Sequence, residues 1–267
     1  MNLNSKVTLH TGNKMPILGL GTWQLSDDTA GTIAKALLLG YPMIDTSGDY
    51  GTQPGIAEGI KKSRAKREDF YLITKVEETD DAYEATKRNL QELQLDYADL
   101  MLIHRPPKGG AGLKLWEGLK RAKREGLAKD IGVSNYSAKL IEELVESSGE
   151  VPVVNQIEWS PFGHSFDMLD YCTENDIIVQ AYSPLTRSER LNDPELTEIA
   201  SKYEKSPAQI LTRWNLQIGT VPIIKANKVE HLKEDLNVFD FEITDEDMET
   251  LNSLNEEYSA LGDLQYV

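Results

Sequence analysis

The chain has 267 residues, and 40% hydrophobic and 27% charged residues are the composition of an ordinary soluble globular protein. No apolar run approaches the roughly 18 residues that span a bilayer, and the formal net charge of −16 argues against nucleic acid or an anionic membrane as a partner. Cys172 is the only cysteine, which excludes an internal disulfide, and the N-terminus has no signal-peptide pattern. These features predict a cytoplasmic location.

Short β-rich runs alternate with longer helical patterns from end to end. Residues 7–18, with Gly12-Asn13 in their middle, predict an N-terminal β-hairpin that could close the floor of a barrel. Near-continuous apolar runs, typical of parallel strands buried on both faces, lie at residues 17–23, 42–45, 70–75, 98–104, 128–134, 153–157, 177–182 and 221–225. Amphipathic stretches lie between them, for example at residues 82–95, 113–125, 138–147 and 206–217.

Several of these stretches carry helix-start signals. Asp80 or Asp81 and Ser137 stand where N-caps belong, and Pro207 suits a first helical turn. Strand–helix alternation at this pace predicts βαβ units, which close either as a doubly wound open sheet or as a barrel. Eight repeats without a long irregular linker favour the barrel. The open sheet is also disfavoured because the segment after the first run lacks the glycine fingerprint of an open-sheet nucleotide site. We therefore predict a single (β/α)8 TIM barrel domain over residues 1–267.

Polar residues follow the predicted strands at the end where a parallel barrel carries its catalytic groups. Asp45, Lys75 and His104 end three of the runs, and Tyr50 follows the first of them closely. A tyrosine has a free pKa of about 10 and is a poor acid, but the ammonium of Lys75, held by Asp45, would stabilise its phenolate. Tyr50 would then protonate a developing alkoxide while His104 directs the carbonyl. None of these groups supplies a hydride, so a reduction needs a cofactor.

The sequence resembles the aldo-keto reductase superfamily, in particular its short prokaryotic-type members. The motifs that carry the resemblance lie at residues 19–23, 44–46, 50–51, 73–75, 102–106, 131–135, 155–156, 181–185 and 238–241, and they cover essentially the whole chain. The resemblance implies a (β/α)8 barrel, NAD(P)H-dependent reduction of an aldehyde or ketone, and a catalytic tetrad of Asp45, Tyr50, Lys75 and His104. Small members are often monomers, and a monomer is the expectation here.

The resemblance also implies how the cofactor is held. Ser134, Asn135 and Gln156 would bind the carboxamide, and Tyr182 would stack on the nicotinamide ring. Further contacts fall on Thr22 and Trp23 at the nicotinamide end, on Ser183, Leu185 and Arg187 at the pyrophosphate, and on Lys225, Ala226, Asn227, His231, Glu234 and Asp235 at the adenosine end, where Lys225 would meet the 2′-phosphate.

The adenosine end departs from the pattern of members strict for NADPH. These have a serine, an arginine and an asparagine where this chain has Ala226, His231 and Asp235. A mostly neutral His231 loses a bidentate phosphate contact. Asp235 would repel a phosphate but could accept from a free 2′-hydroxyl. The expected cofactor is NADP(H), with meaningful use of NAD(H).

The predicted mouth of the pocket is charged where many relatives are apolar. Asp49, Glu77 and Arg105 join Trp23 as predicted substrate contacts, and Arg105 replaces the usual tryptophan. A charged mouth favours small polar or sugar-derived carbonyl compounds. Arg105 either binds a substrate carboxylate or pairs with Glu77 or Asp49, and the sequence leaves both open. Short surrounding loops predict an open, permissive pocket.

The sequence also allows two other functions. No histidine or cysteine pattern has metal-ligand spacing, so no metal site is predicted. An aldolase would use Lys75 as a Schiff base, although Asp45 argues for a charged, non-nucleophilic lysine. A non-catalytic nucleotide-sensing subunit is the other rival, and the intact tetrad argues against it.

Overall fold

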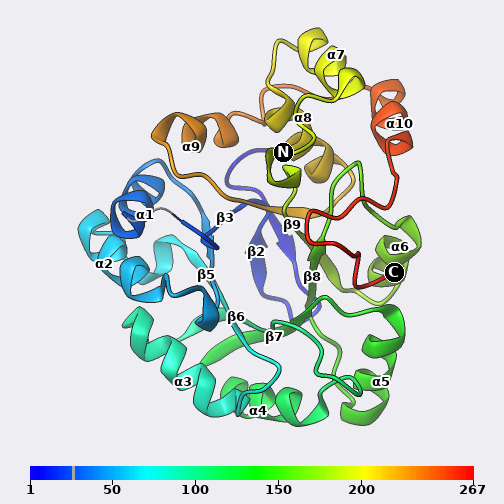
Figure 1. Ribbon diagram of the computed structural model, residues 1–267. Coiled ribbons are helices and arrows are strands. Elements are labelled where there is room, and N and C mark those ends of the chain that lie inside the picture. Colours follow the sequence, from blue (N-terminus) through cyan, green and yellow to red (C-terminus); the bar gives the residue numbers. More distant parts are fainter. Residues whose placement is uncertain (26–27) are drawn as a thin grey trace.

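Eight short parallel strands close into a barrel ringed by helices (Figure 1). The computed structural model describes residues 1–25 and 28–267. The barrel strands follow one another in chain order: β3 (Gly19–Gly21), β4 (Met43–Asp45), β5 (Tyr71–Val76), β6 (Ala98–Ile103), β7 (Ala128–Ser134), β8 (Val154–Glu158), β9 (Ile178–Tyr182) and β10 (Val221–Ile224), which pairs with β3 to close the ring. The predicted barrel is confirmed, and the open-sheet alternative is wrong.

Every predicted strand is present, and most are shorter than the apolar run that predicted them. The first run, residues 17–23, differs most, since only β3 pairs with its neighbours. Ile17 and Leu18 are buried all the same, because burial does not require a ladder hydrogen bond. Gly19 is needed for this close packing: a Cβ there would lie 2.8 Å from the side chain of Ile223.

The N-terminal hairpin closes the floor of the barrel, as predicted. Its strands, β1 (Lys6–Thr8) and β2 (Lys14–Pro16), pair antiparallel, and in Figure 1 they lie behind the ring of barrel strands. Met15 is fully buried in the cluster of apolar side chains that fills the barrel interior. Asn13 donates to the carboxylate of Asp130 at 2.9 Å, which ties the hairpin to β7. The end of the barrel opposite the hairpin is therefore left uncovered by it.

The helices form the outer layer and begin at the predicted caps. Asp81 accepts a hydrogen bond from the backbone of Glu84, and Ser137 accepts one from the backbone of Leu140. Pro207 opens its helix. The α-helices are α1 (Thr29–Leu38), α2 (Gln53–Ser63), α3 (Ala82–Leu93), α4 (Leu113–Arg124), α5 (Ala138–Ser148), α6 (Phe166–Glu174), α7 (Pro194–Lys202), α8 (Pro207–Gln217), α9 (Val229–Leu236) and α10 (Asp245–Ser253). Short 3₁₀ turns add η1 (Gly48–Tyr50), η2 (Arg67–Asp69) and η3 (Thr186–Ser188).

The chain after α10 runs back over the carboxyl ends of the strands, as the red segment of Figure 1 shows. The buried carboxylate of Glu158, at the end of β8, holds it by accepting from the Ser259 hydroxyl at 2.6 Å and the Ala260 amide at 2.8 Å. The Tyr266 hydroxyl donates to the Glu158 carbonyl oxygen. The C-terminal segment is thus fixed beside the rim. Within the described residues, no helix is long and apolar enough to cross a membrane.

Candidate active site

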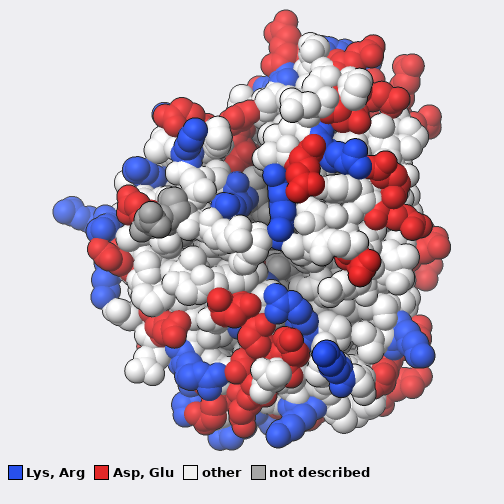
Figure 2. Space-filling model, viewed as in Figure 1, with Lys and Arg blue, Asp and Glu red and all other residues white. Residues whose placement is uncertain are grey.

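A cavity of about 570 Å³ opens at the carboxyl ends of the barrel strands. Figure 2 shows basic side chains beside the centre of this face and many acidic ones towards its periphery. Most of the predicted site residues line the cavity: Trp23, Asp45, Tyr50, His104, Arg105, Ser134, Asn135, Gln156, Tyr182, Ser183, Leu185, Arg187, Lys225, Ala226, Asn227 and His231. Motifs that are far apart in the sequence therefore converge on one site.

A buried ion pair forms the base of the site. The Lys75 ammonium donates to the two carboxylate oxygens of Asp45 at 2.8 and 2.9 Å and to the Thr46 carbonyl at 2.8 Å. Gln156 Nε2 donates to the same carboxylate at 2.9 Å. Three acceptors use all three ammonium protons, so Lys75 has no lone pair to attack a carbonyl. This arrangement opposes the Schiff-base alternative.

Tyr50 lies between this pair and the cavity. Its hydroxyl is 3.5 Å from Lys75 Nζ and 3.5 Å from His104 Nε2. Burial, followed by the Asp45 and Asp49 carboxylates, holds the pKa of Tyr50 well above its usual value. Burial of the hydroxyl outweighs the predicted acidification by Lys75, and the nearby carboxylates add to this effect. Tyr50 therefore keeps its proton until a negative oxygen forms beside it.

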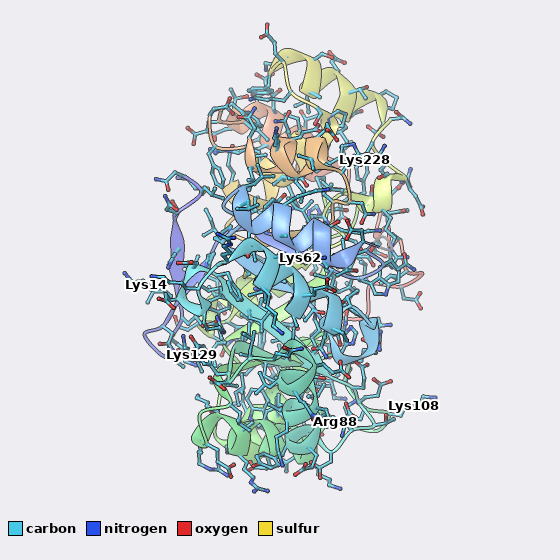
Figure 3. The ribbon with its side chains drawn as sticks, turned by 90° about the vertical axis from the view of Figure 1, so that its left-hand side faces the viewer. Lys14, Lys62, Arg88, Lys108, Lys129 and Lys228 are labelled. Atoms are coloured by element: carbon cyan, nitrogen blue, oxygen red, sulfur yellow. The ribbon has the colours of Figure 1, made fainter. Side chains whose placement is uncertain are left out.

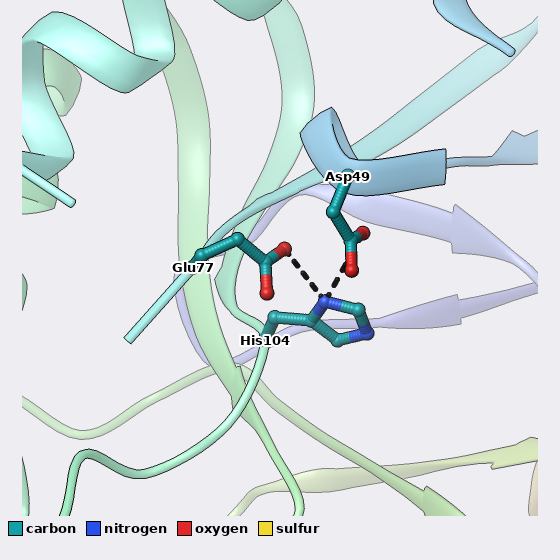
Figure 4. A group of neighbouring side chains, drawn as sticks. All are labelled: Asp49, Glu77 and His104. Carbon is teal, nitrogen blue, oxygen red and sulfur yellow. Dashed lines mark hydrogen bonds and ion pairs between the residues drawn. The ribbon is translucent and has the colours of Figure 1, made fainter. Parts of the chain in front are cut away.

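A second cluster of charged side chains, which includes Asp49 and Glu77, surrounds His104 at the mouth of the cavity (Figure 4). His104 Nδ1 is 2.8 Å from Glu77 Oε1 and 3.5 Å from Asp49 Oδ1. Arg105 pairs with Glu77 at 3.1 Å and more loosely with Asp49 at 3.9 Å. The pairing that the sequence left open is therefore present. The Asp49, Glu77 and His104 ligand atoms lie within 4.8 Å of one another, and we interpret the group as an ion-pair network because Arg105 and the Ser47 hydroxyl already bond Glu77.

The charge state of His104 follows from these neighbours. Burial, then the Lys75 and Arg105 charges, lower the pKa of His104 to about 3. Burial also raises the pKa of the Glu77 carboxyl. The ring is therefore neutral at neutral pH.

The loops after β7 and β9 form the wall that extends from His104. Asn135 Nδ2 donates to the His104 carbonyl at 3.1 Å, and Asn135 Oδ1 accepts from the Tyr182 hydroxyl at 2.8 Å. The backbone of Asn135, Ser183 and Arg187 is in the left-handed region, with φ of 64°, 48° and 52°. Non-glycine residues adopt this conformation at a cost and often at functional sites. It turns both loops towards the cavity.

One cation–π contact and the C-terminal segment shape the opening. The Arg187 guanidinium lies 4.3 Å from the centre of the Trp23 ring, so the loop after β9 reaches the loop after β3. Leu261 and Gln265, from the C-terminal segment, also line the cavity. The predicted open pocket is thus partly covered by a segment that the sequence analysis treated as a short tail.

The end of the cavity that was predicted to hold the adenosine is more basic than the sequence indicated. Lys228 lines the cavity together with Lys225 and His231. In Figure 3, Lys228 extends from the start of α9 on the side of the molecule opposite Lys14 of the hairpin. Lys228 was not among the predicted contacts, although its position between the predicted Asn227 and His231 was a usable signal.

Asp235 corrects the prediction for this end. It is 4% exposed and faces inward from α9, 3.5 Å from the Tyr41 hydroxyl, not towards the cavity. Burial raises its pKa to about 7, so it is not the fixed negative charge that was expected to repel a phosphate. His231 and Asp235 are four positions apart and share one side of α9, so their spacing suggested a common site, but the packing of Tyr41 against Leu232 and Asp235 buries the second of them.

Other predicted residues also lie outside the cavity wall in the described part of the chain. Thr22 is buried, with its hydroxyl 3.2 Å from that of Thr52. The other predicted site residues that do not line the cavity are Asp49, Lys75, Glu77 and Glu234. Residues of the wall that sequence analysis missed, besides those already named, are Gly21, Gln24, Pro184, Ser188 and Ile223. Most of them are sequence neighbours of predicted residues, and only the folding of the chain brings them to the cavity wall.

Comparisons with known proteins agree with this geometry. The chain is 37% identical to the glyoxal reductase of Bacillus subtilis over 262 residues, which are 96% of this chain and 95% of that protein. It is 38% identical to an uncharacterized oxidoreductase of the same organism over 265 residues, 96% of this chain and 94% of that protein.

Solved structures give the same result. An aldo-keto reductase of Bombyx mori in complex with NADP matches with a TM-score of 0.89 and 32% identity, covering 96% of this chain and 94% of that chain. An aldo/keto reductase from Brucella melitensis matches with a TM-score of 0.88 and 37% identity, covering 94% and 99%. The model of the aldo/keto reductase family matches residues 17–256. With this match and this barrel, the chain belongs to the aldo/keto reductase family.

Proposed function

We propose that this protein reduces small polar carbonyl compounds with NAD(P)H, using Tyr50 as the proton donor. The observation that carries the proposal is the contact of the Tyr50 hydroxyl with both Lys75 and His104 at the inner end of the cavity. A protonated phenol at that point can donate to a carbonyl oxygen as negative charge develops on it.

The residues then have distinct roles in the reaction. When bound, a nicotinamide cofactor would supply the hydride for the carbonyl carbon. Tyr50 donates its proton to the oxygen, and the resulting phenolate lies beside the Lys75 ammonium, which stabilises it. Asp45 keeps Lys75 charged and in place. The Tyr50 proton is then restored from solvent, so the net addition is one hydride and one proton.

The cavity suits a nicotinamide dinucleotide. Ser134, Asn135 and Gln156 present hydroxyl and amide groups near the tetrad, and Tyr182 offers a ring face beside them. At the far end, Lys225 and Lys228 offer positive charge to a phosphate. The NADP bound to the Bombyx mori relative supports NADP(H) as the main cofactor. NAD(H) use remains part of the proposal, and it rests on Ala226 and His231 alone, since Asp235 does not reach the cavity.

The substrate class follows from the mouth of the cavity. Asp49, Glu77 and Arg105 make it charged, and a charged mouth favours small oxygen-rich or sugar-derived carbonyl compounds over large apolar ones. The glyoxal reductase of Bacillus subtilis is a relative with a matching substrate class.

Steady-state kinetics with NADPH and NADH would test the proposal. The panel contains glyoxal, glyceraldehyde and a bulky steroid ketone. We expect turnover of the first two and higher kcat/KM with NADPH. Preference for the steroid ketone would contradict the substrate class, and failure of both nicotinamide cofactors to bind the folded protein would contradict the function.

A further inference from the structure

His104 lies at the end of a chain of polar contacts that starts at Lys75. The Lys75 Nζ is 3.5 Å from the Tyr50 hydroxyl oxygen, which is itself 3.5 Å from His104 Nε2. On the other side of the ring, His104 Nδ1 is 2.8 Å from Glu77 Oε1. Glu77 was predicted to contact the substrate at the mouth, but in the structure the nearest partner of its carboxylate is the His104 imidazole.

The protons of this chain can be assigned by counting donors. The Ser47 hydroxyl donates to Glu77 Oε1 at 3.0 Å, and Arg105 donates to Glu77 Oε2 at 3.1 Å. These donors favour an ionised carboxylate, which can only accept. His104 Nδ1 must then carry the proton of that 2.8 Å contact. A neutral ring with its proton on Nδ1 has a bare lone pair at Nε2, which faces Tyr50.

A bare Nε2 matters for the reaction, because a carbonyl oxygen needs donors around it and a lone pair repels it. One added proton removes the conflict. With the proton on Glu77, its hydroxyl donates to Nδ1 and the ring proton sits on Nε2. With the proton on the ring, both nitrogens carry hydrogen. In both cases Nε2 becomes a donor.

We propose that Glu77 is a positioning residue, which through Nδ1 sets whether His104 Nε2 presents an acceptor or a donor to the substrate oxygen. This inference rests on the proposed function, since it assigns a role in carbonyl reduction. The Glu77–His104 pair takes up one proton as a unit, and only the protonated pair directs a carbonyl. Reduction then falls about tenfold per pH unit above the apparent pKa of the pair.

Several charged or titratable groups face His104 and set that pKa: Asp45 of β4, Asp49 and Tyr50 of η1, Lys75 of β5, Glu77 just after β5, and the adjacent Arg105. The positive charges of Lys75 and Arg105 oppose a proton on the His104 ring, whereas burial of the Glu77 carboxyl favours a proton on that carboxyl. The pair therefore accepts its proton mainly on Glu77.

The test uses Glu77→Gln, with Glu78→Gln as the matched control. The Glu78→Gln substitution removes the same charge near the same arginine, since the Glu78 carboxylate lies 3.8 Å from the Arg105 guanidinium. In Glu77→Gln the side-chain amide can donate to Nδ1 at any pH, which fixes the ring proton on Nε2. We expect the alkaline fall of kcat/KM for reduction in the wild-type protein and in Glu78→Gln. In Glu77→Gln the profile should be flat over the same range.

A direct readout does not depend on activity. Nitrogen-15 NMR of histidine-labelled protein reports which ring nitrogen is protonated, and with 4 histidines in the chain, the His104→Gln spectrum identifies the His104 signals. We expect a protonated Nδ1 and a bare Nε2 in the wild-type protein at neutral pH, with the reverse in Glu77→Gln. The same spectra show whether each variant is folded.

The outcomes separate this inference from the proposed function. A wild-type His104 with its proton on Nε2, or an alkaline fall that persists unchanged in Glu77→Gln, would overturn the role of Glu77. If instead no carbonyl is reduced, or Tyr50→Phe is fully active, the proposed function is wrong, and the NMR result alone decides whether Glu77 sets the ring tautomer.

Discussion

The Lys75 ammonium and the Asp45 carboxylate form an ion pair of 2.8 Å in which the lysine side chain is 0% exposed. Both charges have left water, so each depends on the other for its solvation. The pair lies directly beneath Tyr50, and the same contacts that keep Lys75 charged also prevent it from acting as a nucleophile. Stability and chemistry are therefore coupled at this point.

Asp45→Asn should destabilise the fold by about 3 kcal/mol, because it leaves a buried ammonium without its counter-charge. Chemical denaturation would measure the loss. Glu58→Gln is the control, since Glu58 pairs with Lys62 on the surface, where both side chains are more than half exposed, and its loss should cost less than about 1 kcal/mol. Equal losses in the two variants would show that the buried pair has no special weight.

Tyr50→Phe should lower kcat by on the order of a hundredfold or more, because no other group beside the carbonyl position holds a proton in the same way. Cofactor affinity should stay within about twofold of the wild-type value. Fluorescence titration and steady-state kinetics measure the two quantities. Tyr171→Phe, on α6 outside the cavity, serves as the control, and a Tyr50→Phe variant as active as this control would refute the assignment.

Lys228→Ala should weaken NADPH binding by about tenfold and leave NADH binding nearly unchanged, because only NADPH brings a second charged group to the lysines. Lys233→Ala removes the same charge from α9 at a position that does not line the described cavity. We expect the control to bind both cofactors normally. A similar loss in both lysine variants would point to the overall field of the helix instead of a direct contact.

His231→Arg should raise the preference for NADPH over NADH, since a guanidinium can bond a phosphate with two donors. His231 is exposed and lines the cavity, so the larger side chain has room. The ratio of kcat/KM for the two cofactors is the measurement. If the ratio does not move, the 2′-phosphate lies closer to Lys225 and Lys228 than to α9.

Arg105→Ala should change KM for carboxylated and neutral aldehydes by similar factors, because Arg105 is already paired with Glu77 and Asp49. Parallel kinetics on glyoxylate and glyoxal would measure this. A rise confined to the carboxylated substrate would instead show that the guanidinium leaves its partners to bind the substrate anion.

The sequence by itself determined the barrel and indicated which four polar residues would gather at its rim. Near-continuous apolar runs separated by amphipathic stretches allow few folds, and the caps at Asp81 and Ser137 are local signals that need no tertiary contact. Asp45, Lys75 and His104 were found because a strand end in a parallel barrel has a known location, whatever the rest of the chain does.

Only the tertiary structure decided how the side chains are directed. Asp235 was expected at the cofactor and is buried against Tyr41, while Glu77 was expected at the substrate and bonds His104. The C-terminal segment reaches the cavity through Glu158, more than one hundred positions earlier in the chain. Sequence spacing fixes which residues can share a local element, but the direction of a side chain and its partner depend on packing between elements that are distant in the chain, and on charge pairs that form only when water is excluded.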